Sequence, residues 1–537
     1  MPRLVWREEE TDVLVVGRGV AGLMAALAAA EAGARVVVAG IGNGASSWLQ
    51  GVNVPLGHAD PRDGPAALEA DILREGHGES DPLLAQATAL EAEAAFETLL
   101  RIGVDFAQDD GRFRQRHPSG STYPRCCYVA SAMWGPVALQ ALKTALRARP
   151  DVSLLRARFV RFLRDGEGVI GAVGRDERSD ENLLVRTPRV ILAAGGLGDL
   201  YGHSTYPADT YGASYAMAAV AGAKLSGMEF VQFEPLVGAA PETIRGFVIP
   251  TTLFGDGAFL VDARGRRFLL ETRPQGEAGI GKEELVHAIA RTALAGRALP
   301  SGAVWLDTTR VPRQVLEAYP WFWRFMTKHG IDPSRERIEI RPAAHTCLGG
   351  IVVDSGRRTT LPGLFAAGEA AGGVHGAGRL AGGSGTDVIV SGRRAGLSAA
   401  ATTADAPDRE TALAVAETFF SPNAEPDLPP ERAQVMGAEA RAILSRAAGI
   451  WRDGAGLSAG LRAIGRLADE AAGALASPAS LRLRIQDRLR VSAMIIEAAL
   501  ARRESRGAHQ RLDSHGTLAA DHSVRPIRHH AEGSLVR

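Results

Sequence analysis

The sequence predicts an α/β fold built on a βαβ, Rossmann-like dinucleotide-binding unit. Residues 11–40 run from an apolar strand through a tight turn into an alanine-rich helix and a second apolar strand. The turn reads GRGVAG, which matches the GxGxxG pattern at Gly17, Gly19 and Gly22. The first glycine permits the turn, the second lets a pyrophosphate approach the backbone, and the third packs the helix on the strand. The strand before the turn and the helix after it supply the context that this motif requires.

A second glycine-rich stretch organises the rest of the chain. The sequence predicts strands at 350–354 and 363–367, followed by a glycine-rich loop at 368–385 and a helix that begins near Thr386. Glycines leave backbone N–H groups uncovered, so a ligand can approach them closely. The positive N-terminal end of the following helix favours an anionic ligand. The polar residues set among these glycines are Glu369, His375, Arg379 and Ser384.

Composition excludes several classes of protein. The chain has 537 residues, enough for two to four domains, and its 61 Lys+Arg balance its 61 Asp+Glu. Nothing in this balance favours nucleic acid or an acidic membrane surface. Cys126, Cys127 and Cys347 have neither metal-ligand spacing nor a disulfide framework, so we expect no metal site and a reducing, cytoplasmic location. The charged N-terminus lacks a signal peptide, and Arg18 interrupts the first apolar run, so no membrane span is expected.

The remaining segments alternate between helical and extended patterns. Apolar spacing predicts helices over much of 60–110 and an amphipathic helix at 135–150. Residues 152–176 read as a pair of strands joined like a hairpin, and 188–200 begin with a strand that ends in Ala-Ala-Gly-Gly. A proline-rich linker and antiparallel helices are expected after residue 400.

These motifs resemble the flavoprotein family of fumarate reductase, succinate dehydrogenase and L-aspartate oxidase. The segment HGAGRLAGGSG at 375–385 is similar to the family's HGANRLGGNSL, 205–233 is similar to its TGDG-to-VQF segment, and RRESRGAH at 502–509 is similar to its closing motif. The resemblance implies a two-dinucleotide-binding-type FAD domain with an inserted α+β capping domain and a C-terminal helical domain. The expected boundaries are 1–234 and 346–405 for the FAD-binding domain, 235–345 for the capping domain, 406–425 for the linker, and 426–537 for the helical domain and tail.

The resemblance also implies which residues contact FAD. Residues 43–55 resemble the family segment that lies along the isoalloxazine ring, with Ser47, Gln50 and Gly51 at the matching positions. The family's covalent histidine corresponds to Ala45, so we expect FAD to be bound non-covalently. No acidic ribose ligand stands at the end of the second strand, where Ala39 and Gly40 occur, and the adenosine contact is left unassigned. The further expected cofactor contacts are Gly17, Gly19, Gly22, Gly195, Gly196, Glu369 and Ser384.

Four residues match the family's catalytic positions. His345 and Arg379 correspond to the His and Arg that hold the substrate, and Lys282 corresponds to the Arg that delivers protons. Glu234 stands where the family has a His that holds a second substrate carboxylate. A Glu234 carboxylate would repel that group and attract an amine or hydroxyl, or it would pair with Lys282; the sequence favours neither reading. Lysine can serve as a proton carrier when burial lowers its pKa.

Three functions remain open. The leading one is an FAD-dependent oxidoreductase that transfers a hydride between flavin N5 and a small carboxylate-bearing molecule, by C–C desaturation or reduction or by C–N oxidation. Its substrate is expected not to be plain succinate, fumarate or aspartate, although an L-aspartate oxidase-like enzyme is an alternative. The second is an electron-transfer subunit with an iron–sulfur partner, and the third is a flavoprotein without turnover. Four aromatics within 320–325 are either core or an apolar substrate wall.

Overall fold

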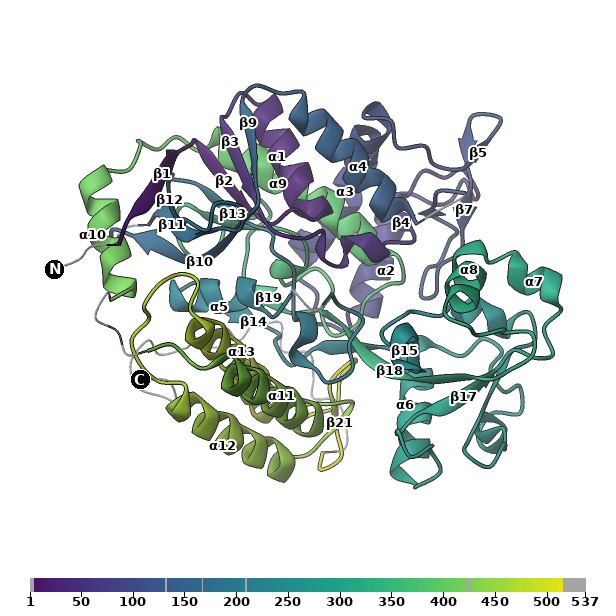
Figure 1. Cartoon of the computed structure of the whole chain (residues 1–537). Coiled ribbons are helices and arrows are strands. Elements are labelled where there is room, and N and C mark those ends of the chain that lie inside the picture. Colours follow the sequence, from purple (N-terminus) through teal and green to yellow (C-terminus); the bar gives the residue numbers. More distant parts are fainter. Residues whose placement is uncertain are drawn as a thin grey trace. The chain divides into compact units, whose positions relative to one another are not determined.

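The computed structural model describes residues 4–130, 133–166, 168–207, 210–421, 424 and 426–514. The chain forms two compact units, which are described separately (Figure 1). The larger unit comprises Met1–Gly202, Pro207–Phe230 and Cys347–Arg537. The smaller unit comprises His203–Tyr206 and Val231–Thr346, so it is an insertion in the chain of the larger one.

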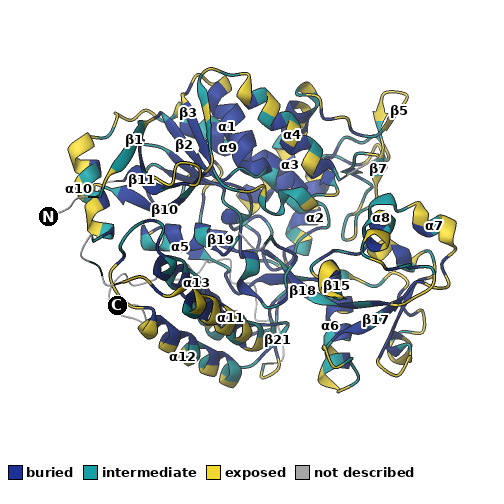
Figure 2. Cartoon of the chain, viewed as in Figure 1, coloured by how far each residue is buried: buried dark blue, intermediate teal, exposed yellow. Residues whose placement is uncertain are grey.

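A five-stranded sheet lies at the centre of the larger unit. Its strand order is β20-β13-β2-β3-β9, and every neighbouring pair is parallel. The strands are short apolar runs, which suits a sheet covered on both faces. Figure 2 shows β2 and β3 in the dark blue of buried residues. The bounds are β2 Val13–Val16, β3 Val36–Ala39, β9 Val152–Leu155, β13 Val190–Leu192 and β20 Leu364–Ala366.

Two helices that open at the glycine-rich segments pack against each other. They are α1 (Val20–Glu31) and α9 (Gly383–Ala401). A Cβ on Gly392 would lie 2.4 Å from the carbonyl oxygen of Ala21, and one on Gly396 would lie 2.2 Å from that of Ala25. The two helices therefore approach so closely that only glycine fits at these positions on α9.

A second sheet has the order β1-β12-β11-β10, and its β10 and β11 pair antiparallel as the sequence predicts. The bounds are β1 Trp6–Glu10, β10 Ala157–Arg164, β11 Val169–Asp176 and β12 Asn182–Arg186. The linker expected at 406–425 is wrong in part, because it contains the helix α10 (Arg409–Phe419). Asp408 caps this helix, and Ala412 and Ala416 enter the core formed with β10 and β11, so the segment gains the buried face that a linker lacks.

The other helices of the larger unit cover its sheets and form a C-terminal bundle. Within that bundle α11, α12 and α13 pack on one another. The helix near residue 386 begins three residues earlier than expected, at Gly383. The strand expected at 350–354 forms β19 (Gly350–Ile351) and one further isolated bridge at Val353. The helix bounds are α2 Pro65–Glu75, α3 Pro82–Arg101, α4 Trp134–Arg147, α5 Ala213–Val220, α11 Pro430–Ala447, α12 Gly454–Glu470 and α13 Leu481–Ala501.

The smaller unit is a four-stranded sheet of order β15-β18-β17-β16 with three helices. The aromatic segment at 320–325 lies in α8, where Phe322 is fully buried and Phe325 stacks on Phe247 at 3.8 Å between ring centroids. This segment is therefore largely core. The bounds are β15 Val231–Ala240, β16 Phe259–Val261, β17 Val304–Asp307, β18 Ile338–Cys347, α6 Lys282–Leu294, α7 Arg313–Glu317 and α8 Pro320–Lys328. None of the helices in the described part of the chain combines the length and apolar character that a membrane span requires.

Candidate functional site

The first glycine turn joins β2 to α1, and its three glycines differ in what surrounds them. Gly17 has φ +129°, and a Cβ on it would lie 2.1 Å from the carbonyl oxygen of Ala193. A Cβ on Gly22 would lie 2.1 Å from the carbonyl oxygen of Gly17. A Cβ on Gly19, the N-cap of α1, would meet first the side-chain oxygen of Ser46 at 2.9 Å. The packing of the protein itself therefore requires Gly17 and Gly22, whereas Gly19 keeps the helix N-terminus accessible.

Ser46 rather than Ser47 touches this turn. Its Oγ accepts a hydrogen bond from the backbone N–H of Val20 at 3.0 Å. Both serines lie in a short 3₁₀ helix, Gly44–Trp48, so neighbouring residues point in different directions. The sequence pattern matched Ser47 to the family and did not identify Ser46. Gln50 of the same segment is exposed.

The second glycine-rich segment brings the start of α9 against residues 51–53. A Cβ on Gly385 would lie 2.4 Å from the carbonyl oxygen of Gly51. Thr386 Oγ1 donates to the carbonyl oxygen of Asn53 at 2.8 Å and accepts from its N–H at 3.1 Å. Asn53 is fully buried, and its Oδ1 has no hydrogen-bond partner among the described residues. Sequence reasoning missed Asn53, which no motif distinguishes from its neighbours.

Glu369 connects this segment to the turn after β13. Its Oε1 accepts from the backbone N–H of Cys347 at 2.8 Å, and a Cβ on Gly196 would lie 2.1 Å from the same oxygen. Burial raises the pKa of Glu369 to about 8, while the Cys347 N–H and the Arg379 guanidinium act in the opposite direction. Gly195 has φ +81°, so it adopts the left-handed conformation that glycine tolerates best. The Glu369 carboxyl therefore lies against the turn after β13, which contains Gly195 and Gly196.

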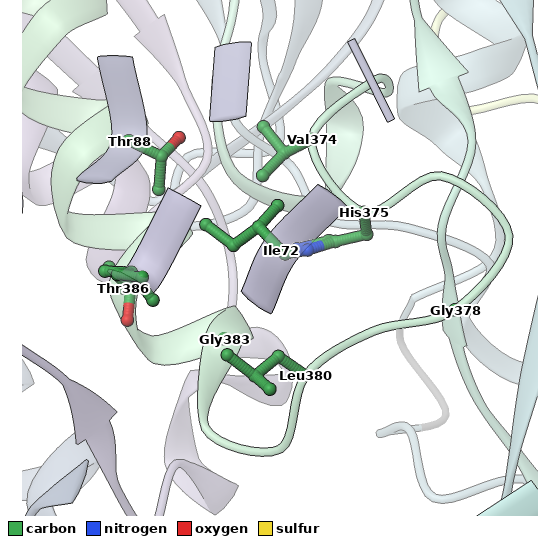
Figure 3. Close-up of a pocket in the computed structure, with 9 residues that line it drawn as sticks. Ile72, Thr88, Val374, His375, Gly378, Leu380, Gly383 and Thr386 are labelled. Atoms are coloured by element: carbon green, nitrogen blue, oxygen red, sulfur yellow. The ribbon is translucent and has the colours of Figure 1, made fainter. Parts of the chain in front are cut away.

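Arg379 is half-buried in the loop before α9. His375 lies close to it: burial lowers the pKa of His375 to about 3, and the Arg379 charge contributes to that shift. A small, mainly apolar pocket lies beside His375 and is lined also by Ile72, Thr88, Leu380 and Thr386 (Figure 3). Its apolar lining supports no role in holding a carboxylate substrate.

The other three expected catalytic residues meet in the smaller unit. Lys282 is the first residue of α6, and its Nζ donates to Glu234 Oε2 at 2.6 Å. His345 Nε2 lies 3.7 Å from the same oxygen. Glu234 and His345 are on β15 and β18, which are adjacent strands of one sheet. Of the two readings that the sequence left open for Glu234, the structure contains the ion pair with Lys282.

Thr205 extends this group and was missed by the sequence analysis. Its Oγ1 lies 3.0 Å from His345 Nδ1, and its N–H donates to the carbonyl oxygen of Ala344 at 3.0 Å. Glu234 carries a hydrogen bond from a lysine, which favours its carboxylate form. The Thr205 hydroxyl also lies 3.4 Å from the carbonyl oxygen of Ala344, so it can donate either to that oxygen or to His345 Nδ1.

Comparison with known proteins shows the family of the chain. A family model described as FAD binding domain matches residues 12–384, and one described as fumarate reductase flavoprotein C-term matches residues 438–525. A fumarate reductase (CoM/CoB) subunit of Methanothermobacter marburgensis is 31% identical over 525 residues, which cover 94% of each chain. The L-aspartate oxidase of Agrobacterium fabrum is 35% identical over 510 residues, which cover 93% of this chain and 90% of that relative.

The solved structures agree as well. Mycobacterium smegmatis Sdh1 in complex with UQ1 superposes with a TM-score of 0.84 at 29% identity, over 95% of this chain and 90% of that one. The predicted family and fold are confirmed. The chain therefore belongs to the FAD-binding flavoprotein family of fumarate reductase and L-aspartate oxidase, and it is an FAD-dependent oxidoreductase.

Proposed function

We propose that this enzyme oxidises or reduces a C–C or C–N bond next to a carboxylate in a small molecule. The observation that carries the proposal is the Lys282–Glu234–His345 group, in which a partly exposed lysine and a histidine lie 2.6 and 3.7 Å from one carboxylate oxygen. FAD, when bound, accepts or supplies the hydride. The protein has to hold the substrate and move one proton.

The residues of the larger unit fit FAD. The backbone at Gly19 and the N-terminal ends of α1 and α9, whose glycine N-caps supply no side chain, are proposed to face phosphate or flavin oxygens. The first N–H of each helix already has a protein partner, since Val20 donates to Ser46 Oγ and Gly383 to the carbonyl oxygen of Leu380. The buried side-chain oxygen of Asn53, which has no hydrogen-bond partner among the described residues, and the partly buried carboxyl of Glu369 suit a polar heterocycle or ribityl chain. Gly51, Gly195, Gly196 and Ser384 are the further proposed contacts. We expect the flavin to be released by acid precipitation, because Ala45 cannot form a covalent link; colour that stays with the pellet would contradict this.

Each catalytic residue has a proposed role. Arg379 binds a substrate carboxylate, because its guanidinium offers two parallel donors that fit this group. Lys282 moves the proton, and Glu234 holds it in position through their hydrogen bond. His345, whose Nε2 lies 3.7 Å from Glu234 Oε2, is proposed to donate a hydrogen bond to a substrate oxygen when its Nε2–H turns from the carboxylate to the substrate.

The ion pair also bears on the substrate class. The charges of Lys282 and Glu234 cancel, so this group does not attract a second carboxylate as a lone cation would. The substrate is therefore proposed to carry one carboxylate together with an amine, hydroxyl or uncharged group, rather than to be succinate, fumarate or aspartate. Glu234→His should shift binding toward dicarboxylates, and unchanged relative affinities would contradict this assignment.

The direct test is an anaerobic screen of carboxylic and amino acids for bleaching of the flavin absorbance. The screen should identify a monocarboxylate or amino acid that bleaches the flavin faster than succinate or L-aspartate does. If no carboxylate bleaches a fully loaded enzyme, and none reoxidises the reduced enzyme, the proposed reaction is wrong.

A second candidate is an electron-transfer subunit with an iron–sulfur partner, in the cytoplasm. It is favoured by the similarity to a protein that is named as one subunit of a fumarate reductase. Readmission of oxygen to the bleached enzyme distinguishes the two candidates. Fast reoxidation by oxygen supports an oxidase, whereas slow reoxidation by oxygen and fast reoxidation by a one-electron dye support a partner-dependent enzyme.

A further inference from the structure

The side chain of Arg18 lies at the end of β3, the second strand of the βαβ unit, where a dinucleotide site usually has an acidic residue. Arg18 stands between Gly17 and Gly19 in the first turn, and its Nη1 donates to the carbonyl oxygen of Gly40 at 3.3 Å. Gly40 follows β3 directly, and a Cβ on it would lie 2.9 Å from Arg18 Cγ. Gly40 therefore gives the Arg18 side chain the room to lie across the end of β3.

This guanidinium is surrounded by other cations. Burial and the charges of Arg147, Arg178 and Arg156 lower the pKa of Arg18. The Arg18 charge in turn contributes to lowering the pKa of Lys143, whose Nζ donates to Asn43 Oδ1 at 2.5 Å. Among the described residues Arg18 makes no ion pair with a carboxylate, and its buried Nε has no hydrogen-bond partner. A partly buried cation beside like charges is costly, so an anionic or acceptor group on a ligand would stabilise it.

The position on the sheet indicates which part of a dinucleotide would meet Arg18. Ligands of parallel α/β sheets bind at the carboxyl ends of the strands, and the residue at the end of the second strand contacts the adenosine ribose. A carboxylate there accepts hydrogen bonds from ribose hydroxyls and repels a phosphate on the ribose. A guanidinium donates to ribose oxygens and attracts such a phosphate.

We propose that Arg18 is the adenosine-ribose contact of the FAD site and that this contact accepts an anionic group on the ribose. The Arg18 side chain takes the place of the acid that is absent at Ala39 and Gly40. The proposal concerns cofactor binding alone, so it stands or falls independently of the substrate assigned above.

The first test measures the dissociation constant of FAD for the wild type and for Arg18→Ala, Arg18→Lys and Arg147→Ala. Arg147 is an exposed member of the same cationic group, so Arg147→Ala removes equal charge without the contact to Gly40. Arg18→Ala should weaken FAD binding roughly tenfold or more, which corresponds to one lost hydrogen bond from a charged donor. Arg147→Ala should weaken it by less than about threefold. Wild-type affinity in Arg18→Ala, or equal losses in both variants, would overturn the proposal.

The second test locates the contact on the nucleotide. Adenosine 5′-monophosphate and adenosine 2′,5′-bisphosphate differ only in the ribose phosphate, and each is titrated against bound FAD while flavin release is followed by fluorescence. The bisphosphate should displace FAD at lower concentration than the monophosphate from the wild type, and this difference should disappear in Arg18→Ala. Arg18→Lys keeps the charge and should retain part of the preference for the bisphosphate. It keeps the test informative if Arg18→Ala does not fold. An equal loss for both nucleotides would place Arg18 on the 5′-phosphate and refute the ribose contact.

Discussion

At the scale of single residues, the bond to Glu234 holds the ammonium group of Lys282 in place. Glu234 is 7% exposed and Lys282 is 25% exposed, so the pair lies at the boundary between protein and solvent. A lysine in that position can exchange protons with water and still be held at one point by its hydrogen bond. In the proposed mechanism, the same bond would hold a lysine in the place of the family's arginine.

Lys282→Met should reduce the rate of flavin reduction by roughly 100-fold while FAD stays bound, because the methionine keeps much of the stem but carries no proton. Lys328→Met is the matched control, since Lys328 is an exposed lysine of the same unit at the end of α8. Stopped-flow reduction at several substrate concentrations gives the rate and the affinity separately. If Lys282→Met reduces its flavin at the wild-type rate, Lys282 has a structural role, and His345 is the next candidate for the proton carrier.

Glu369 should make stability depend on pH. Burial raises the pKa of Glu369 from 4.5 to about 8, so the folded protein holds this proton more tightly than the unfolded chain does. Its contribution to the free energy of unfolding is therefore complete below 4.5 and is lost as the pH rises to about 8. Urea unfolding of flavin-free protein should show this decline in the wild type and not in Glu369→Gln. Parallel pH profiles for the two proteins would show that Glu369 does not titrate in this range.

At the scale of elements, the two glycine-opened helices define where a ligand can approach. Both α1 and α9 begin with a glycine N-cap that supplies no capping side chain. The positive N-terminal ends of the two helices favour negative charge, and a nucleotide pyrophosphate is the ligand proposed to supply it. Gly17 and Gly22 allow the close packing of the turn, and Gly19 leaves space at the N-terminus of α1.

Gly19→Ala should leave the protein folded but weaken FAD binding, because the added methyl group lies at the helix N-terminus and its nearest protein neighbour is the Ser46 hydroxyl. Gly17→Ala should instead lower the melting temperature, because its Cβ would overlap the Ala193 backbone. Gly64→Ala is the control: Gly64 is the extended N-cap of α2, and a Cβ added to it would have nothing within 4 Å. Equal FAD affinity in Gly19→Ala and Gly64→Ala would refute the assignment of Gly19.

At the scale of the whole molecule, the closing motif ties distant parts of the larger unit together. Arg502 donates to Glu229 at 2.6 Å, to Glu504 at 2.6 Å and to both oxygens of Glu79 at 3.0 Å. Buried Arg452 donates to His509 Nδ1 at 2.7 Å and to the carbonyl oxygen of Glu229 at 2.7 Å. The C-terminal helices therefore belong to the same compact unit as the dinucleotide-binding sheet.

Arg502→Met should destabilise the protein by about 3–5 kcal/mol, because it leaves the buried carboxylate of Glu229 without its cation. Arg432→Met, which breaks an ion pair with exposed Glu470, should change stability little. Thermal unfolding at saturating FAD compares the two variants. A loss in Arg502→Met no larger than that in Arg432→Met would show that the network contributes no more than a surface pair.

The sequence by itself determined the features that neighbouring residues encode. The GRGVAG turn, the hairpin of β10 and β11 and the start of α9 to within three residues follow from local periodicity and turn chemistry. The family follows from the resemblance of several motifs in the sequence. A tight turn requires glycine because of the conformation of a few consecutive residues, so it can be predicted without knowledge of the fold.

Only the tertiary structure decided which side chains meet. The bond between Lys282 and Glu234 joins a helix start to a strand 48 residues away, and Thr205 reaches His345 across 140 residues. The 3₁₀ turn determines that the Ser46 hydroxyl bonds the start of α1, while the cofactor contact of Ser47 stays a prediction. The helix α10 forms in the expected linker because its alanines pack into a core with β10 and β11. These contacts depend on burial and on partners distant in sequence, which local patterns do not contain.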